Sequence, residues 1–282
     1  MTNCIHFFNK FKNFSIMKKL MLVALAILAT QFYLSAQQTE TTKEKKEKKN
    51  KGNYNNNWNN WGGGERIQGE GPSVTENRDI RDFKGFKSGI SADITLKQST
   101  GGYKVTVQGQ KNIIALVKME IVDGNLRIGF EKGYSVNYKE PLKITLEAPS
   151  FEYLGMSGSG NVKTDGGLSG TKATIAISGS GDFDLNNLKF ETLNVGISGS
   201  GNVDLDGTVG SVELGVSGSG DVKAENLKTQ SARCRVSGSG NITLNVQKEL
   251  DASVSGSGDI RYYGKPASVR THVTGSGDIV SK

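Results

Sequence analysis

The feature that most limits what this chain can fold into is a four-residue block, [Ser/Thr]-Gly-Ser-Gly, that recurs throughout its second half. The blocks begin at Ser157, Ser178, Ser198, Ser217, Ser237, Ser255 and Thr274, so that successive blocks start about 20 residues apart. Glycine-serine tracts usually act as flexible linkers. Linkers have no reason to keep a constant spacing, however, whereas a fixed period of roughly 20 to 50 residues is typical of repeat architectures.

The residues that flank the blocks indicate which repeat architecture this is. An aliphatic residue or Met precedes each block. An Asn or Asp follows the block, and another apolar residue comes directly after that Asn or Asp. In the third repeat Leu193, Val195 and Ile197 lead into the block, each separated from the next by one residue. A period of two is typical of β-strands with one apolar face, and no interval has room for a helix. We therefore predict an all-β fold, in which residues 151–282 form a single-stranded, right-handed parallel β-helix with one repeat per coil.

The glycines of each block are predicted to form a corner at which successive coils stack. Glycine suits such a corner for two reasons, because it adopts positive φ and because it leaves room where backbones approach closely. No coil of this length can bury enough apolar surface to fold alone, so the coils stabilise one another. The corner glycines are Gly158, Gly179, Gly199, Gly218, Gly238, Gly256 and Gly275.

The position after each block is always Asn or Asp, and these residues are predicted to form one column along the stack. They are Asn161, Asp182, Asn202, Asp221, Asn241, Asp259 and Asp278. Carboxylates on adjacent coils, about 4.8 Å apart, repel one another, and alternation with Asn separates them and supplies amide donors. The last two positions break the alternation. A second, outward column is predicted two residues further on, at Lys163, Asp184, Asp204, Lys223, Thr243 and Arg261, with favourable Lys163–Asp184 and Asp204–Lys223 pairs.

Residues 1–36 are predicted to be a signal peptide. Lys18 and Lys19 precede an apolar run that ends in Ser35-Ala36, and either Met1 or Met17 is the start. Residues 37–71 are rich in Lys, Asn and Gly and are predicted to be a disordered tether. Its Trp58 and Trp61 are either part of the linker or stack on sugar rings. No later segment is apolar enough to span a bilayer, so we expect an exported protein, in the periplasm, at the outer membrane or outside the cell.

Residues 72–150 are predicted to be a β-rich segment that caps the N-terminal end of the β-helix. Ile90, Ala92, Ile94 and Leu96 alternate with polar residues, as in a strand. Asp123-Gly124 is a strong hairpin signal between two apolar segments. The stretch from Asn112 to Lys118, "NIIALVK", is either a short helix or a buried strand, and periodicity does not separate the two.

Composition argues against several kinds of partner and cofactor. The net charge of +7 lies almost entirely before residue 72, and the remaining chain is nearly neutral, so nucleic-acid binding has no electrostatic basis. After the signal peptide the chain holds one cysteine, Cys234, and one histidine, His272. These are too few for a catalytic triad or a His/Cys zinc site. We expect no cofactor and no metal, and interpret Cys234 as a small buried hydrophobe and His272 as a surface residue.

The acidic residues of the two columns leave one catalytic alternative open. Asp182 with Asp184, and Asp204 with Asp206, would place paired carboxylates on adjacent coils, as in β-helices that cleave polysaccharides. We favour structural columns over such a site. The calcium-binding β-roll pattern does not match, because its period and the place of its Asp differ.

Several stretches resemble a known family. "FKSGISADITLKQ", "VDGNLRI", "ISGSGDFDL", "ISGSGNVDL" and "VSGSGDVKA" are similar to the head GIN domain family of putative auto-transporter adhesins of Gram-negative bacteria, from about Phe83 to Ile279. The resemblance implies a β-helical, secreted or surface-associated protein with an adhesive role, and it supplies no catalytic residue. The sequence continues only to Lys282, without a membrane-barrel segment, so an auto-transporter route is not expected.

These observations predict an exported envelope or surface protein that is not an enzyme and presents its β-helix to a glycan or an envelope protein. The alternatives are a polysaccharide-active hydrolase or lyase and a purely structural envelope component. The last coil carries no visible cap residues, which predicts an exposed sheet end that associates with further copies.

Overall fold

The computed structural model describes residues 64–282. The predicted signal peptide, both start sites, Trp58, Trp61 and the tether up to residue 63 lie outside the described residues. Among those described, strands dominate and the helical segment is short. In chain order the elements are β1 (Glu65–Gln68), β2 (Ser73–Arg78), β3 (Gly85–Ser88), β4 (Asp93–Gln98), β5 (Lys104–Gln110), α2 (Lys111–Ile114), β6 (Val117–Val122), β7 (Asn125–Phe130), β8 (Tyr134–Asn137), β9 (Lys143–Ala148), β10 (Tyr153–Met156), β11 (Val162–Thr164), β12 (Ser169–Ile177), β13 (Phe183–Ile197), β14 (Val203–Val216), β15 (Val222–Val236), β16 (Ile242–Val254), β17 (Ile260–Tyr263), β18 (Ser268–Val273) and β19 (Ile279–Ser281).

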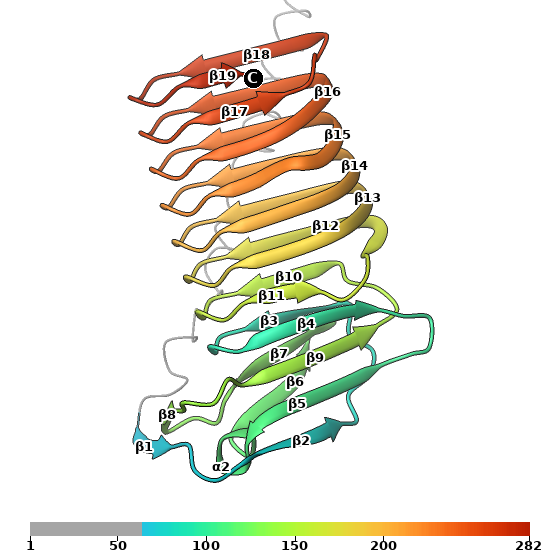
Figure 1. Ribbon diagram of the computed structural model, residues 1–282, viewed down its shortest axis with the longest axis vertical. Helices are drawn as coiled ribbons and strands as arrows, with labels where there is room; N and C mark the ends of the chain where they lie inside the picture. Colours follow the sequence, from blue (N-terminus) through green and yellow to red (C-terminus); the bar gives the residue numbers. More distant parts are fainter. Residues whose placement is uncertain (1–63) are drawn as a thin grey trace, which may run out of the picture. The chain divides into compact units, whose positions relative to one another are not determined.

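The repeats form a β-solenoid, which confirms the predicted fold (Figure 1). Strands β13 to β16 each run from one Gly-rich corner almost to the next, and each pairs in parallel with its successor. Leu214, for example, is in register with Val195 below and Cys234 above. Buried and exposed residues alternate along these strands, so the period of two predicted from the sequence places one apolar row inside every coil.

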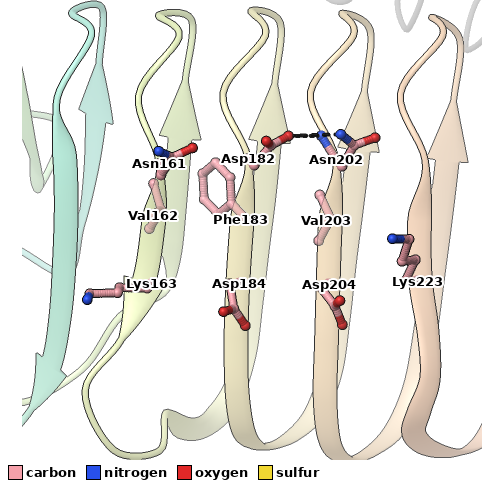
Figure 2. Close-up of a pocket in the computed structure, with 10 residues that line it drawn as sticks. All are labelled: Asn161, Val162, Lys163, Asp182, Phe183, Asp184, Asn202, Val203, Asp204 and Lys223. Carbon is pink, nitrogen blue, oxygen red and sulfur yellow. Dashed lines mark hydrogen bonds between the residues drawn. The ribbon is translucent and has the colours of Figure 1, made fainter.

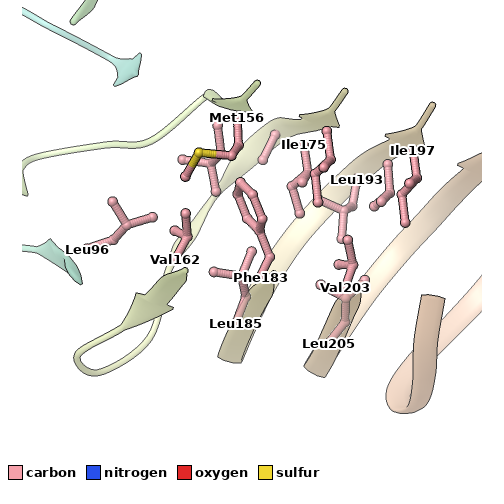
Figure 3. Packing of buried hydrophobic residues seen from close by; sticks show 14 of the residues in the cluster. Leu96, Met156, Val162, Ile175, Phe183, Leu185, Leu193, Ile197, Val203 and Leu205 are labelled. Atoms are coloured by element: carbon pink, nitrogen blue, oxygen red, sulfur yellow. The ribbon is translucent and has the colours of Figure 1, made fainter. Parts of the chain in front are cut away.

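The core lies between the two sides of each coil. In Figure 3 Val162, Phe183 and Val203 from one side face Ile175 and Leu193 from the other. Cys234 is fully buried in the same core, as predicted. Its burial raises the pKa of the thiol, which keeps it protonated and unreactive.

At the corners, one of the two predicted reasons for glycine is wrong. None of the seven predicted corner glycines has a positive φ. Close stacking alone accounts for them: a Cβ added to Gly199 would lie well inside van der Waals contact with the carbonyl oxygen of Gly179, in the coil before. The next residue ties the same two coils together, because the Ser200 N–H donates to that carbonyl at 3.1 Å.

The parallel stack extends into the segment before Ser150. Strands β3 and β4 pair with β10 and β11 on one side, and with β7 and β9 on the other, all in parallel. The β3–β4 coil thus lies between two layers that both follow it in sequence. Its corner carries Ile90 and Ala92 where the next coil has Gly158 and Gly160, whose added Cβ atoms would collide with the carbonyls of Ile90 and Ala92. Glycine is therefore needed only where another such corner lies beneath.

Antiparallel strands cover the β7–β9 layer. Strand β5 pairs with β9 and β2, and β6 pairs with β7. The predicted β6–β7 hairpin is confirmed, with positive φ at Asp123 (51°) and Gly124 (72°). The ambiguous stretch from Asn112 is divided between both predicted structures, because α2 ends at Ile114 and β6 begins at Val117.

The predicted tether ends earlier than Gly71. Glu65–Gln68 form strand β1, which pairs in parallel with β8, so the prediction of disorder is wrong for these residues. Ile67 packs against the core, and the side-chain amide of Asn112 donates to the Gln68 carbonyl at 2.8 Å. These contacts fix a segment whose composition alone resembles the linker before it.

The last described coil of the solenoid has a paired coil on one side only. Among the described strands, β18 pairs only with β16, and β19 only with β17. Val269 and Val273 are in register with the buried Leu250 and Val254, yet they are 42% and 44% exposed. His272 is exposed on the same strand, as predicted. No helix among the described residues is long and apolar enough to cross a membrane.

We expect this last described coil to associate with a second copy of the chain. Another solenoid end has the same cross-section, so it can cover the exposed core residues together. Sedimentation velocity should show self-association that rises with concentration. Val273→Lys should reduce it, whereas Val280→Lys, at an outward position in register with Arg261, should change it less. A monomer at high concentration would contradict this expectation.

Candidate functional site

The predicted columns come together along a depression that crosses four coils (Figure 2). Its volume is about 450 Å³. The corner column forms one side and the outward column the other, and apolar side chains between them point into the core. The lining residues are Asn161, Val162, Lys163, Asp182, Phe183, Asp184, Asn202, Val203, Asp204 and Lys223.

Hydrogen bonds in the corner column show why Asn and Asp alternate. Asp182 Oδ1 accepts both the backbone N–H of Asn202 at 2.7 Å and its Nδ2 at 3.0 Å. Asn202 Oδ1 in turn accepts the backbone N–H of Asp221 at 3.0 Å. The pattern repeats one step further, where Asn241 donates twice to Asp221. Each amide thus donates to a carboxylate below it and accepts from the backbone above it, and no two carboxylates are adjacent in this part of the column.

The column begins one coil before the first predicted member. Asn161 Nδ2 donates to Asp93 Oδ1 at 3.0 Å, so Asp93 is the first Asp of the series. Sequence reasoning missed it because the corner of that coil lacks the Ser-Gly-Ser-Gly block and carries Ile90 and Ala92 in place of its two glycines. The pattern of an Asp followed by alternating Ile94 and Leu96 is the signal that could have found it.

At the other end, two aspartates follow one another. The Asp278 backbone N–H donates to Asp259 Oδ1 at 2.9 Å. The other oxygen of Asp259 forms an ion pair with Arg261 at 2.7 Å. No Asn separates these two carboxylates, so they repel each other. The arginine compensates part of this repulsion.

The outward column has the predicted register. Asp184 lies between Lys163 and Asp204, and Asp204 is followed by Lys223. Neither Lys163–Asp184 nor Asp204–Lys223 is among the ion pairs within 4.0 Å in the described part of the chain. Lys223 nevertheless lowers the pKa of Asp204, as a favourable pair should. Register brings these backbones together, but long lysine side chains have other rotamers open to them in solvent.

Asp204 has the most perturbed carboxyl group of this column. Partial burial raises its pKa, and the negative charges of Asp184 and Glu225 raise it further, while Lys223 lowers it. Asp182, Asp184 and Asp206 accept hydrogen bonds from asparagines. No such bond to Asp204 occurs among the described residues, so its carboxylate is free to face a ligand.

We expect Asp204→Asn to stabilise the protein at neutral pH but not in acid. A raised pKa in the folded state means that stability falls as pH rises from the ordinary pKa through the raised one. The substitution removes this penalty, which is less than about 1 kcal/mol because solvent screens an exposed charge. Thermal unfolding should show a higher melting temperature at pH 7 and no change near pH 3, about one unit below the ordinary pKa. In an Asp184→Asn background the gain should shrink, and an equal gain at both pH values would contradict the assignment.

The described residues place no group of three or more His, Cys, Asp or Glu side chains where they could hold a metal ion. Of the four acids in the catalytic alternative, Asp182 is committed to the corner column, and Asp206 accepts a backbone N–H of the preceding coil. Asp184 and Asp204 remain as neighbours on adjacent coils. The arrangement as a whole offers carboxylates, amides and ammonium groups, one polar side chain per column on each coil, to a polar ligand.

Comparison with known proteins gives a family and a set of similar structures. The model of the family described as "Putative auto-transporter adhesin, head GIN domain" matches residues 82–266. A putative adhesin from Bacteroides fragilis has a similar structure, with a TM-score of 0.74 and 30% identity over 77% of this chain and 100% of that one. Among curated proteins, no relative matches the chain.

Two further structures share the fold. One is a putative lipid binding protein from Parabacteroides distasonis, with a TM-score of 0.66, and the other a putative adhesin from Parabacteroides merdae, with a TM-score of 0.62. Each is 24% identical over 77% of this chain, and the match covers 100% and 99% of their own chains.

Proposed function

Since this chain belongs to the head GIN domain family of putative auto-transporter adhesins, we propose that it is an exported binding protein of the cell envelope or cell surface, whose ligand is a glycan. The observation that carries this proposal is the pair of polar columns along the depression. Each column places one polar side chain on every coil, about every 4.8 Å. A polysaccharide repeats its hydroxyl groups along an extended chain, so that several coils can each contribute a polar group to it.

The rigidity of the corner column supports the same proposal. Asp182, Asn202 and Asp221 are linked by hydrogen bonds to one another and to the backbone. Groups that are already ordered lose little conformational entropy when a ligand binds. The free carboxylate of Asp204 and the ammonium groups of Lys163 and Lys223 then supply charge-assisted hydrogen bonds to hydroxyls.

A second candidate function is cleavage of the polysaccharide, and Asp204 is the observation that favours it. A carboxyl group with a raised pKa beside a second carboxylate is the pair that glycoside hydrolysis requires. Asp204 and Asp184 have this relationship. We place binding first because the same columns also have a structural role, linking successive coils by hydrogen bonds.

One experiment separates glycan binding from polysaccharide cleavage. Purified protein is passed over immobilised polysaccharides, and the soluble forms are assayed for reducing and unsaturated ends. Retention without new ends is the expected result. Asp184→Asn combined with Lys223→Ala should weaken retention, whereas Lys248→Ala, an exposed lysine of β16 outside the depression, should not.

If the protein releases new reducing or unsaturated ends and Asp204→Asn abolishes this release, the proposed function changes from binding to cleavage. Failure to retain any polysaccharide, with retention of an envelope protein instead, would overturn the glycan as ligand while leaving the binding role. The remaining alternative is a purely structural envelope component, which would bind neither.

A further inference from the structure

A second concave site lies beside the start of β12, and it shares no residue with the depression. It exists because one core position is empty. In the later coils the equivalent inward positions hold Phe190, Val209 and Thr229, all buried. Gly170 is the register partner of Phe190, so the first side chain of this row is missing.

The backbone does not require a glycine at this position. Gly170 has no positive φ, and an added Cβ would meet only the ring of Phe190, at 3.2 Å. The residue therefore leaves a notch of about 510 Å³ in the wall of the solenoid, with Phe151 and Phe190 beneath it.

Hydrogen bonds hold the rim of the notch in place. Gln98 Nε2 donates to the carbonyls of Pro149 and Ser169, both at 3.0 Å. Its Oε1 accepts the backbone N–H of Ser169 at 2.6 Å. The Thr174 N–H donates to the carbonyl of Glu152 at 2.9 Å. The two segments that form the rim are thus tied together, and the notch is preformed.

The chemistry of the notch selects a class of ligand. Its floor is aromatic, whereas its rim carries the polar side chains Ser150, Glu152, Ser169, Thr171, Lys172 and Thr174. The Glu152 carboxylate is ion-paired with Lys84 at 3.4 Å, which leaves the Lys172 ammonium group at the rim as a donor for hydroxyls. An acyl chain would leave most of these polar groups without partners. A neutral sugar ring has C–H groups to pack on the phenylalanines and hydroxyls for the rim, and the volume is in the usual range of about 300–1,000 Å³ for small-molecule sites.

We propose that this notch binds a single neutral hexopyranose residue, at the end or on a side branch of a glycan. The proposal takes its ligand class from the proposed function and adds a separate subsite for one sugar.

The test uses the full-length chain and a set of methyl hexopyranosides as probes, with amide chemical shifts as the readout. Binding with a Kd on the order of 1 mM should shift the amides of residues 169–174. Gly170→Val fills the notch with a side chain like those of the later coils, and it should weaken binding at least about tenfold without lowering the melting temperature. Gly196→Val adds the same side chain at an exposed strand position with nothing within 4 Å of its Cβ, and it should leave binding unchanged.

A second variant covers the case in which Gly170→Val disturbs the fold. Thr171→Val removes a hydroxyl from the rim at nearly constant volume and should weaken binding several-fold. Sodium decanoate and inorganic phosphate serve as lipid-like and anionic probes. Three outcomes would overturn the proposal. They are stronger binding of decanoate or phosphate than of the glycosides, glycoside binding that Gly170→Val does not weaken, and no amide shift with any glycoside. Retention of polysaccharides by the depression does not depend on Gly170, so failure of this subsite and failure of the proposed function are distinguishable.

Discussion

Gly199→Val should destabilise the solenoid by about 3–5 kcal/mol, because the new side chain must occupy space taken by the coil below. Its Cβ would overlap the carbonyl oxygen of Gly179. To relieve the overlap, the coils must separate at a corner where the Ser200 N–H donates to Gly179 and the Ser219 N–H donates to Gly199. Each backbone group left unpaired there costs about 1–3 kcal/mol. Calorimetry should show a melting temperature lower by about 6–20 °C.

Gly196→Val is the matched control, three residues earlier, on strand β13 just before the corner. A Cβ at Gly196 meets nothing within 4 Å, and its φ is not positive. A β-branched residue at an exposed strand position should stabilise the fold, by up to about 1 kcal/mol. Opposite signs for the two variants are expected. Equal melting temperatures would show that the corner glycines are not required by stacking.

Phe183→Ala should destabilise the protein by about 3–5 kcal/mol, the usual cost of removing a buried aromatic ring. Phe183 is 1% exposed and lies between Val162 and Val203, its register partners in the adjacent coils (Figure 3). Because solenoid stability is carried by the interfaces between neighbouring repeats, the cavity weakens the contact on both sides. Urea unfolding followed by circular dichroism measures the loss.

Phe183→Leu is the control for this prediction. Leucine keeps most of the apolar volume, so the loss should be about 1 kcal/mol. A loss below about 1 kcal/mol for Phe183→Ala would mean that the ring is not part of a close-packed interior.

The solenoid and both polar columns were predictable because their pattern is local. Residues such as Val195 and Ile197 alternate with polar neighbours, and this period of two decides which side chains enter the core. A constant repeat length then places equivalent residues above one another. For this reason the register of Asp184 with Asp204, and the alternation from Asp182 to Asn202, followed from spacing alone.

Details that depend on contact distance did not follow from the pattern. Spacing placed Lys163 beside Asp184 but did not decide whether their side chains meet, because rotamers are chosen by solvent and neighbours. The notch at Gly170 was hidden for a related reason. A glycine in a strand looks the same in sequence whether its missing side chain leaves a surface flat, as at Gly196, or leaves a gap in the core.

The sequence by itself determined that equal coils wind around an apolar interior with a Gly-rich corner, since strand period and repeat length are properties of the chain read in order. Only the tertiary structure decided that the β3–β4 coil lies between layers that follow it in sequence. It also decided that the corner glycines are needed because the backbones of adjacent coils approach closely there, and not because they adopt positive φ. The physical reason is that both depend on which backbone is the next neighbour in space, and a pattern along one strand carries no information about the coil beneath it.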